Sequence, residues 1–156
     1  MLKLNETSEQ SILNMLVEHK SITSQQLQQI ETLSREGGKS KLETSFELNI
    51  TDTSKILNIL SEAYSLPKVE LKKIVITDKI KQLAGLRYLR ENIIVPFEFT
   101  SEIVKVAISD SSKLSLIKNI KNITQLEPEL YASSLTEIDN FYKRLENRKN
   151  SEELKS

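Results

Sequence analysis

The residues Gly37-Gly38-Lys39-Ser40 have the types found at the end of a phosphate-binding loop. In such a loop four residues separate an earlier glycine from the Gly-Lys-Ser motif, and Leu33 occupies that earlier position here. The loop also follows a buried strand, so that its backbone amides converge on the phosphates. The residues ahead of this motif have helical spacing instead. The motif therefore predicts a helix C-cap and loop rather than a nucleotide site.

Three other side chains have types that could do acid–base chemistry. Glu127 and Glu129 lie two apart on a predicted edge strand, so their carboxylates share a face and could form a pair. Nothing else converges on them, and solvated protection of the edge is the favoured interpretation. The single histidine, His19, lies near a predicted helix end, where it can interact with the helix dipole. Since the chain has one His and no Cys, we expect no catalytic residue, metal site or cofactor.

The basic residues are concentrated in the middle of the chain. The whole chain has 22 basic and 22 acidic residues, but residues 68–90 have a net charge of +5 between segments of −3 and −2. Tyr88 is the only aromatic residue in this stretch, so base stacking has little support. Charge alone leaves phosphate-backbone contact or a solvated helix face open, but we expect an acidic protein partner and no nucleic acid. The partner-binding candidates are Lys72, Lys73, Arg87 and Arg90.

Composition limits the class of protein. Leu, Ile, Val and Phe make up 49 of the 156 residues, which allows a modest core, in one domain or two small subdomains, but not a large enzyme scaffold. With only 3 Gly, glycine-dependent nucleotide folds are disfavoured. No apolar run approaches the ~18 residues of a membrane span, and the N-terminus has no signal-peptide core. We expect a soluble, cytoplasmic protein with no direct membrane insertion.

Residues 1–67 are predicted to form a helical subdomain of two tandem helix-turn-helix units. A short helix around Leu42 and Phe46 is the third of its four helices. The predicted N-caps of the other three are Thr7 or Ser8, Thr23 and Thr51, and their predicted ends are about Glu18, Gly37-Gly38 and Pro67. The side chains expected to face inward include Ile12, Leu13, Met15, Leu16, Leu27, Ile30, Leu33, Ile56, Leu57, Ile59, Leu60, Ala63 and Tyr64.

Residues 68–145 are predicted to form a small α/β subdomain, followed by a frayed polar tail over 146–156. Alternation over 93–99 and 103–108 predicts a β-hairpin, with Ile93, Val95, Phe97 and Phe99 on one face of its first strand. Pro128 places the third strand, 126–132, at a sheet edge. The predicted helices begin at Thr77 (interrupted at Gly85), at Asp110 and near Leu135. The expected fold is α+β, with the order helix-β-β-α-β-α in this half and a three-stranded sheet.

Several phrases occur in a fixed order along the chain. They are Leu16-Val17-Glu18 with Ile22-Thr23 and Leu27, Leu60 through Pro67 with Val69-Glu70-Leu71, Ile94-Val95-Pro96-Phe97, Val104 through Asp110, and Ile138 through Leu145. In order and spacing, over about residues 10–145, they resemble the N-terminal domain of type II secretion and type IV pilus assembly ATPases, the domain also called MshEN.

This resemblance implies a helical subdomain joined to a small α/β subdomain. In the family the domain precedes a hexameric ATPase motor and binds cytoplasmic parts of the membrane platform, and in some members it binds cyclic di-GMP. The sequence contains no Walker A loop and leaves no room for one after residue 145, so we expect an excised domain or a stand-alone relative, and not an enzyme.

The chain departs from the family's dinucleotide-binding repeat at most ligand positions. Ser11 replaces the Arg of the first repeat, Leu13 and Lys20 replace its two glycines, and Glu31 and Ser34 replace its later Leu and Gln. In the second repeat Lys41 fits the basic position, but Glu43 replaces the Gly. The resemblance thus implies that ligand contacts are lost while core positions are kept, and we expect no tightly bound dinucleotide.

The resulting hypothesis is a non-catalytic docking or regulatory module of a bacterial secretion or pilus assembly system. Its expected partner is a platform protein, with the motor ATPase as a second candidate, and its expected location is the cytoplasm at the inner-membrane periphery. Two alternatives stay open: a cyclic di-GMP sensor domain, and an adaptor of another bacterial pathway that uses the same fold.

Overall fold

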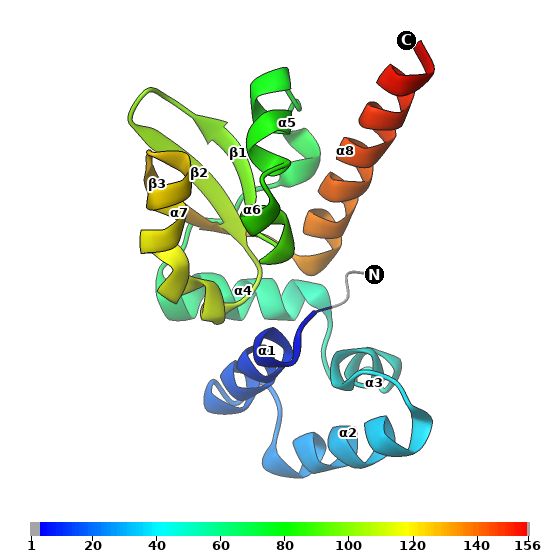
Figure 1. Cartoon of the computed structure of the whole chain (residues 1–156). Coiled ribbons are helices and arrows are strands. Elements are labelled where there is room, and N and C mark those ends of the chain that lie inside the picture. Colours follow the sequence, from blue (N-terminus) through cyan, green and yellow to red (C-terminus); the bar gives the residue numbers. More distant parts are fainter. Residues whose placement is uncertain (1–3, 156) are drawn as a thin grey trace.

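The computed structural model describes the backbone of residues 4–155 and the side chains of residues 4–147. Helices occupy the first part of the chain and a three-stranded mixed sheet follows, which confirms the α+β prediction (Figure 1). In chain order the elements are α1 (Glu6–Glu18), α2 (Ser24–Gly37), α3 (Lys41–Glu47), α4 (Thr53–Tyr64), the 3-10 helix η1 (Leu71–Lys73), α5 (Asp78–Ala84), α6 (Arg87–Glu91), β1 (Val95–Phe99), β2 (Ile103–Ile108), the 3-10 helix η2 (Ser111–Leu116), α7 (Ile117–Thr124), β3 (Glu127–Ala132) and α8 (Leu135–Lys155).

Side-chain caps fix the ends of several helices. Thr23 caps α2, within the segment Ser21-Ile22-Thr23 that the sequence predicts to supply the cap, and it forms a reciprocal capping box with Gln26. Gly38 ends the same helix with a φ of 65°, a left-handed conformation that glycine adopts without steric cost. The Gly-Gly-Lys-Ser motif is therefore a helix end and loop.

Two of the predicted caps are wrong. Asn5, not Thr7 or Ser8, caps α1, because its Oδ1 accepts the Ser8 amide at 2.8 Å. Asp52, not Thr51, caps α4 by accepting the Lys55 amide at 2.8 Å. In both cases an Asx side chain close to the predicted residue, Asn5 before Thr7 and Asp52 after Thr51, reaches the orphan amide. The buried Thr51 faces the core instead, and its Oγ1 has no hydrogen-bond partner within the described residues.

The sheet has the strand order β1-β2-β3 and both of its faces are covered. β1 and β2 pair antiparallel as the predicted hairpin, with an irregularity between Pro96 and Glu98, whereas β3 pairs parallel to β2 after the crossover through η2 and α7. Helices η1, α5 and α8 pack on one face, and α6 and α7 pack on the other. This double cover explains why residues 94–97 are buried in succession rather than alternately.

The four N-terminal helices enclose a core of their own, and α4 contacts both α1 and β3 (Figure 1). Ala132 and Leu135, from the end of β3 and the start of α8, belong to this helical core. The segment after α4 also pairs with β3, because Pro67 accepts the Ala132 amide at 2.8 Å and Ala132 accepts the Val69 amide at 3.0 Å. The predicted boundary between residues 67 and 68 falls in this paired segment. Tyr64, predicted to face inward, is an exposed residue at the last position of α4.

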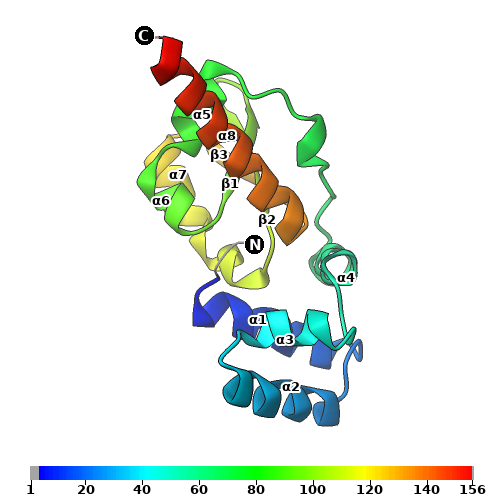
Figure 2. The same ribbon diagram turned by 90° about the vertical axis from the view of Figure 1, so that its right-hand side faces the viewer.

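The last helix is longer than its sequence pattern predicts. α8 runs to Lys155 instead of ending near Leu145, because no Gly or Pro interrupts it. Its first half crosses the sheet (Figure 2) and buries Ile138, Phe141 and Tyr142. The Tyr142 hydroxyl donates to the Ile94 carbonyl at 2.8 Å, and burial raises the pKa of this phenol. The tail over 146–156 that is predicted to be frayed is instead helical as far as Lys155, and its side chains after Asn147 lie outside the described residues.

Candidate functional site

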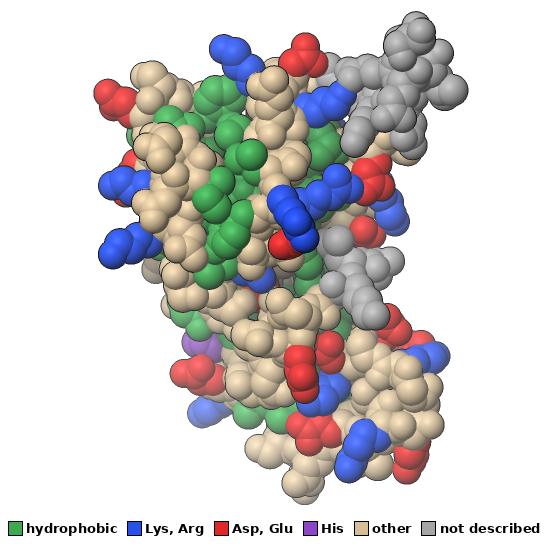
Figure 3. Space-filling model, viewed as in Figure 1, with side chains coloured by type: hydrophobic (Ala, Val, Ile, Leu, Met, Phe, Trp, Pro, Cys, Tyr) green, Lys and Arg blue, Asp and Glu red, His purple; other side chains and the backbone are tan. Residues whose placement is uncertain are grey.

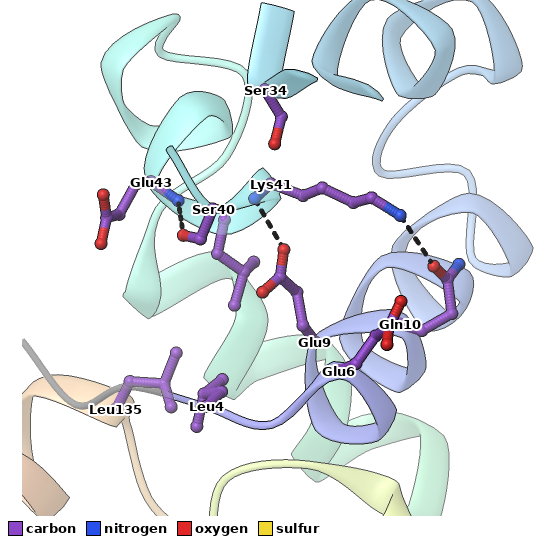
Figure 4. Close-up of a pocket in the computed structure, with 10 residues that line it drawn as sticks. Leu4, Glu6, Glu9, Gln10, Ser34, Ser40, Lys41, Glu43 and Leu135 are labelled. Carbon is purple, nitrogen blue, oxygen red and sulfur yellow. Dashed lines mark hydrogen bonds between the residues drawn. The ribbon is translucent and has the colours of Figure 1, made fainter. Parts of the chain in front are cut away.

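Three of the repeat positions, Ser34 of the first repeat and Lys41 and Glu43 of the second, line a pocket in the helical half (Figure 4). Its volume is about 330 Å³. Helix α1 forms one wall, and the end of α2 with the start of α3 forms the opposite wall. Figure 4 shows Leu4 and Leu135 together at a third side. The pocket is lined by Leu4, Glu6, Glu9, Gln10, Ser34, Ser40, Lys41, Leu42, Glu43 and Leu135.

The donors of this pocket are already engaged by the protein. Glu9 accepts the backbone amide of Lys41 at 2.6 Å, and the Lys41 ammonium donates to Gln10 Oε1 at 3.4 Å. Ser40 caps α3 by accepting the Glu43 amide at 3.1 Å. An anionic ligand would have to displace these contacts, and the lining contains one Lys against three Glu. The pocket is thus poorly suited to a phosphate.

The other four repeat positions, Ser11, Leu13, Lys20 and Glu31, are not among the residues that line this pocket. The Ser11 hydroxyl lies 2.8 Å from that of Ser111 in η2. Leu13 is completely buried in the helical core, as its helical spacing predicts, and its side chain does not line the pocket. Lys20 has a φ of 61°, so the chain keeps a backbone conformation that favours glycine where the family has one.

The four basic candidates are on two separate elements, η1 for Lys72 and Lys73 and α6 for Arg87 and Arg90. Three of them form ion pairs: Lys73 with Glu70 at 2.9 Å, Arg87 with Glu91 at 2.7 Å, and Arg90 with Glu146 of α8. The hydrogen bond from Lys73 lowers the pKa of the Glu70 carboxyl, and the hydrogen bond to Glu91 raises the pKa of Arg87. Lys72 lies by Glu137 and Phe141 of α8. These groups therefore form no single cluster by contact.

The remaining acid–base candidates are exposed. Glu127 forms an ion pair with Lys121 at 2.8 Å, and both Glu127 and Glu129 are on the solvated side of β3, at the predicted edge. His19 is exposed at the C-terminal end of α1. In the described part of the chain, no group of three or more His, Cys, Asp or Glu residues could hold a metal ion.

Buried polar side chains lie where α1 meets η2, a contact that the sequence did not indicate. We call this contact, formed by Ser8, Asp110 and Lys113, the polar seam. Lys113 is only 3% exposed, and its ammonium donates to Ser8 Oγ at 3.1 Å. Asp110 is fully buried, and its Oδ1 caps η2 by accepting the Ser112 amide at 3.0 Å. Its Oδ2 has no hydrogen-bond partner among the residues described. The sequence marks Asp110 as a helix start, but nothing local in it signals a buried lysine three residues later.

A helical half stacked on a small three-stranded mixed sheet is also the architecture of several solved N-terminal domains. The structure of MshE with cdg has 18% identity and a TM-score of 0.61, with 86% of this chain and 97% of that chain covered. The N-terminal domain of XpsE has 20% identity and a TM-score of 0.61 in one crystal form, covering 92% of this chain and 98% of that one. In crystal form I4122 its TM-score is 0.52, at 20% identity and with 92% and 99% covered.

The family model of the MshEN domain matches residues 64–152. The chain therefore belongs to the MshEN domain family, which confirms the resemblance found in the sequence. A comparison with functionally curated proteins finds no significant match. The 156 residues contain this domain and no ATPase motor. Across the described helices, none is both long and apolar enough to cross a membrane.

Proposed function

We propose that this chain is a non-catalytic docking module of a bacterial type II secretion or type IV pilus assembly system. One observation carries the proposal: the chain keeps the fold of the MshEN family, but its pocket is lined by residues that do not suit an anionic ligand. The MshEN match spans residues 64–152, while the pocket of the helical half is lined by three carboxylates and one lysine, whose ammonium donates to Gln10 Oε1 at 3.4 Å. A domain of this family whose pocket disfavours an anion is best suited to bind protein. Its partner is a platform protein at the cytoplasmic face of the inner membrane, with the motor ATPase as second candidate.

Charge reversal tests the docking function. Replacing Lys72 and Lys73, or Arg87 and Arg90, by Glu is expected to slow association with the cytoplasmic domain of a platform protein by about tenfold at low salt, because opposite charge steers encounter. The association rate of the parent should fall as salt is added, because the Debye length shortens to about 3 Å at 1 M salt and screens the attraction. The association rate of the variants should depend less on salt, since less attraction is left to screen. Biolayer interferometry at several salt concentrations measures both effects.

Lys55→Glu provides the matched control, because Lys55 is an exposed cation on α4 of the helical half. It should leave the association rate within about twofold of the parent. If all variants bind alike at every salt concentration, these basic groups lie outside the docking surface. If the platform domains and the motor ATPase all fail to bind the parent chain, the docking function itself is wrong.

A cyclic di-GMP sensor is the second candidate, because MshE has been solved with cdg, which we take to be cyclic di-GMP. We expect a dissociation constant of about 1 mM or weaker for this chain, since each lost phosphate contact costs on the order of tenfold or more. Calorimetry or ligand-detected NMR with about 100 μM ligand measures it, and a dissociation constant under about 10 μM would establish the sensor instead. The adaptor alternative predicts binding to a partner outside secretion and pilus systems.

A further inference from the structure

Half-buried apolar side chains gather in a groove on one face of the α/β half. Figure 3 shows a band of hydrophobic side chains between α7 and the α5–α6 pair. The groove has a volume of about 440 Å³ and is open to solvent. Leu83, Leu86, Phe99 and Leu126 supply its apolar lining, and Lys79 and Gln82 are at its rim.

The strand register explains why these side chains meet. Phe99 ends β1 and pairs with Val104, and Glu127 begins β3 and pairs with Ile103. The end of β1 and the start of β3 therefore lie at the same end of the sheet. Leu83 in α5 and Leu86 just before α6 line the same groove, so residues from three separate segments of the chain form one apolar floor.

Helix α7 packs on the same hydrophobic cluster as the groove residues, because Ile120 is buried in that cluster and the four apolar residues that line the groove pack against it. Ile117, Ile120 and Ile123 are three residues apart and so share one broad face of the helix. Only the middle one is fully buried, since Ile117 is 37% exposed and Ile123 is 39% exposed. A face whose centre is packed and whose ends are solvated can bury further apolar surface against a partner.

The helices around the groove are basic. Helices α5, α6 and α7 together carry six Lys or Arg residues against two acidic residues, a net charge of +4, although the whole chain is neutral. The cations are Lys79, Lys81, Arg87, Arg90, Lys118 and Lys121. Among the described residues, neither Lys79 nor Lys118 forms an ion pair, so both are available to a partner. The groove is apolar in the middle and the helices around it are positive, while the carboxylates of Glu98 and Glu127, next to its Phe99 and Leu126, are paired with Lys105 and Lys121.

We infer that this groove docks an acidic amphipathic helix of the partner protein. Leucine-like side chains on one face of that helix fill the groove, and carboxylates on its flanks meet Lys79 and Lys118. The inference rests on the proposed docking function and locates its partner site. According to this inference, the apolar part of the interface is the groove and not the surface around Lys72, which lies beside α8.

The test uses the full ¹⁵N-labelled chain and two synthetic helical peptides. One has Leu at every third or fourth position with Glu on the flanks, and the other has Lys in place of each Glu. The Glu peptide should perturb amides at Gln82, Leu86, Phe99 and Ile123, with at least tenfold higher affinity than the Lys peptide. The double variant Ile117→Asp/Ile123→Asp should weaken the Glu peptide at least tenfold.

Leu48→Asp is the matched control, because Leu48 has the same 37% exposure as Ile117 but is in the helical half. It should leave peptide affinity unchanged, and circular dichroism verifies that every variant is folded. Equal binding of both peptides, or perturbations confined to other elements, overturns the inference. Sedimentation at high concentration tests for a dimer. A dimer that buries this groove also overturns the inference, because the occupant of the groove is then a second copy of the chain. A platform domain that binds the parent and the double variant equally well overturns the groove while leaving the docking function standing.

Discussion

Replacing Leu13 by the glycine that the family has at this position is expected to destabilise the domain by about 4 kcal/mol. Leu13 is fully buried between the helices of the N-terminal core. Removing a buried leucine side chain costs about 2–5 kcal/mol, and glycine inside a helix costs about 1 kcal/mol more than alanine. Urea unfolding followed by circular dichroism measures the change. Restoring this family residue should therefore damage the fold rather than create a ligand site.

The Glu43→Gly variant makes the corresponding glycine substitution in the second repeat, so its stability cost can be compared with that of Leu13→Gly in the first. Glu43 is exposed in the first turn of α3, so its replacement should cost about 1 kcal/mol or less. It also removes one carboxylate from the pocket lining. A Leu13→Gly loss as small as that of Glu43→Gly would mean that the first helix repacks freely around the missing side chain.

The Asp110→Ala substitution is expected to cost about 2 kcal/mol, because it removes the cap of η2 and leaves the Ser112 amide without its acceptor. Asp110→Asn keeps an oxygen at the Oδ1 position, so we expect it to cost about 0.5 kcal/mol or less. Thermal and urea unfolding of both variants give the comparison.

The Asn variant also tests the role of the second carboxylate oxygen at the seam. Oδ2 has no hydrogen-bond partner among the described residues, and Lys113 is buried nearby in sequence with Ser8 as acceptor. If Asp110→Asn is as destabilising as Asp110→Ala, then the negative charge matters rather than the cap. In that case the carboxylate supports the buried ammonium through space.

Local signals predicted the elements of this fold well. Apolar spacing indicated each long helix, alternation indicated β2, and Thr23 and Thr77 cap helices as expected. The errors occur where two local solutions compete, as with Asn5 against Ser8 and Asp52 against Thr51. The length of α8 was underestimated because its apolar pattern fades after Leu145 while its helix propensity does not.

The candidate site was less predictable because it depends on distant pairs. Lys41 and Glu43, the second-repeat positions in the pocket, are close in sequence, but the acceptor of the Lys41 amide is Glu9 of another helix. The bond between Ser11 and Ser111 spans one hundred residues. The groove joins residues of α5 and β1 with Leu86, just before α6, and Leu126, just before β3, and no local period marks residues that meet only through strand register.

The pairing of Pro67 and Val69 with Ala132 has a mechanical consequence. Ala132 ends β3 and its side chain is also part of the helical core, so a displacement of the N-terminal helices is transmitted directly to this strand. Six residues of β3 span about 20 Å and are held along their length by β2. Leu126, immediately before the other end of the strand, lies in the apolar groove. β3 therefore connects the helical core rigidly to the groove. A displacement of the N-terminal helices reaches the groove through this hydrogen-bonded strand and not through a flexible linker.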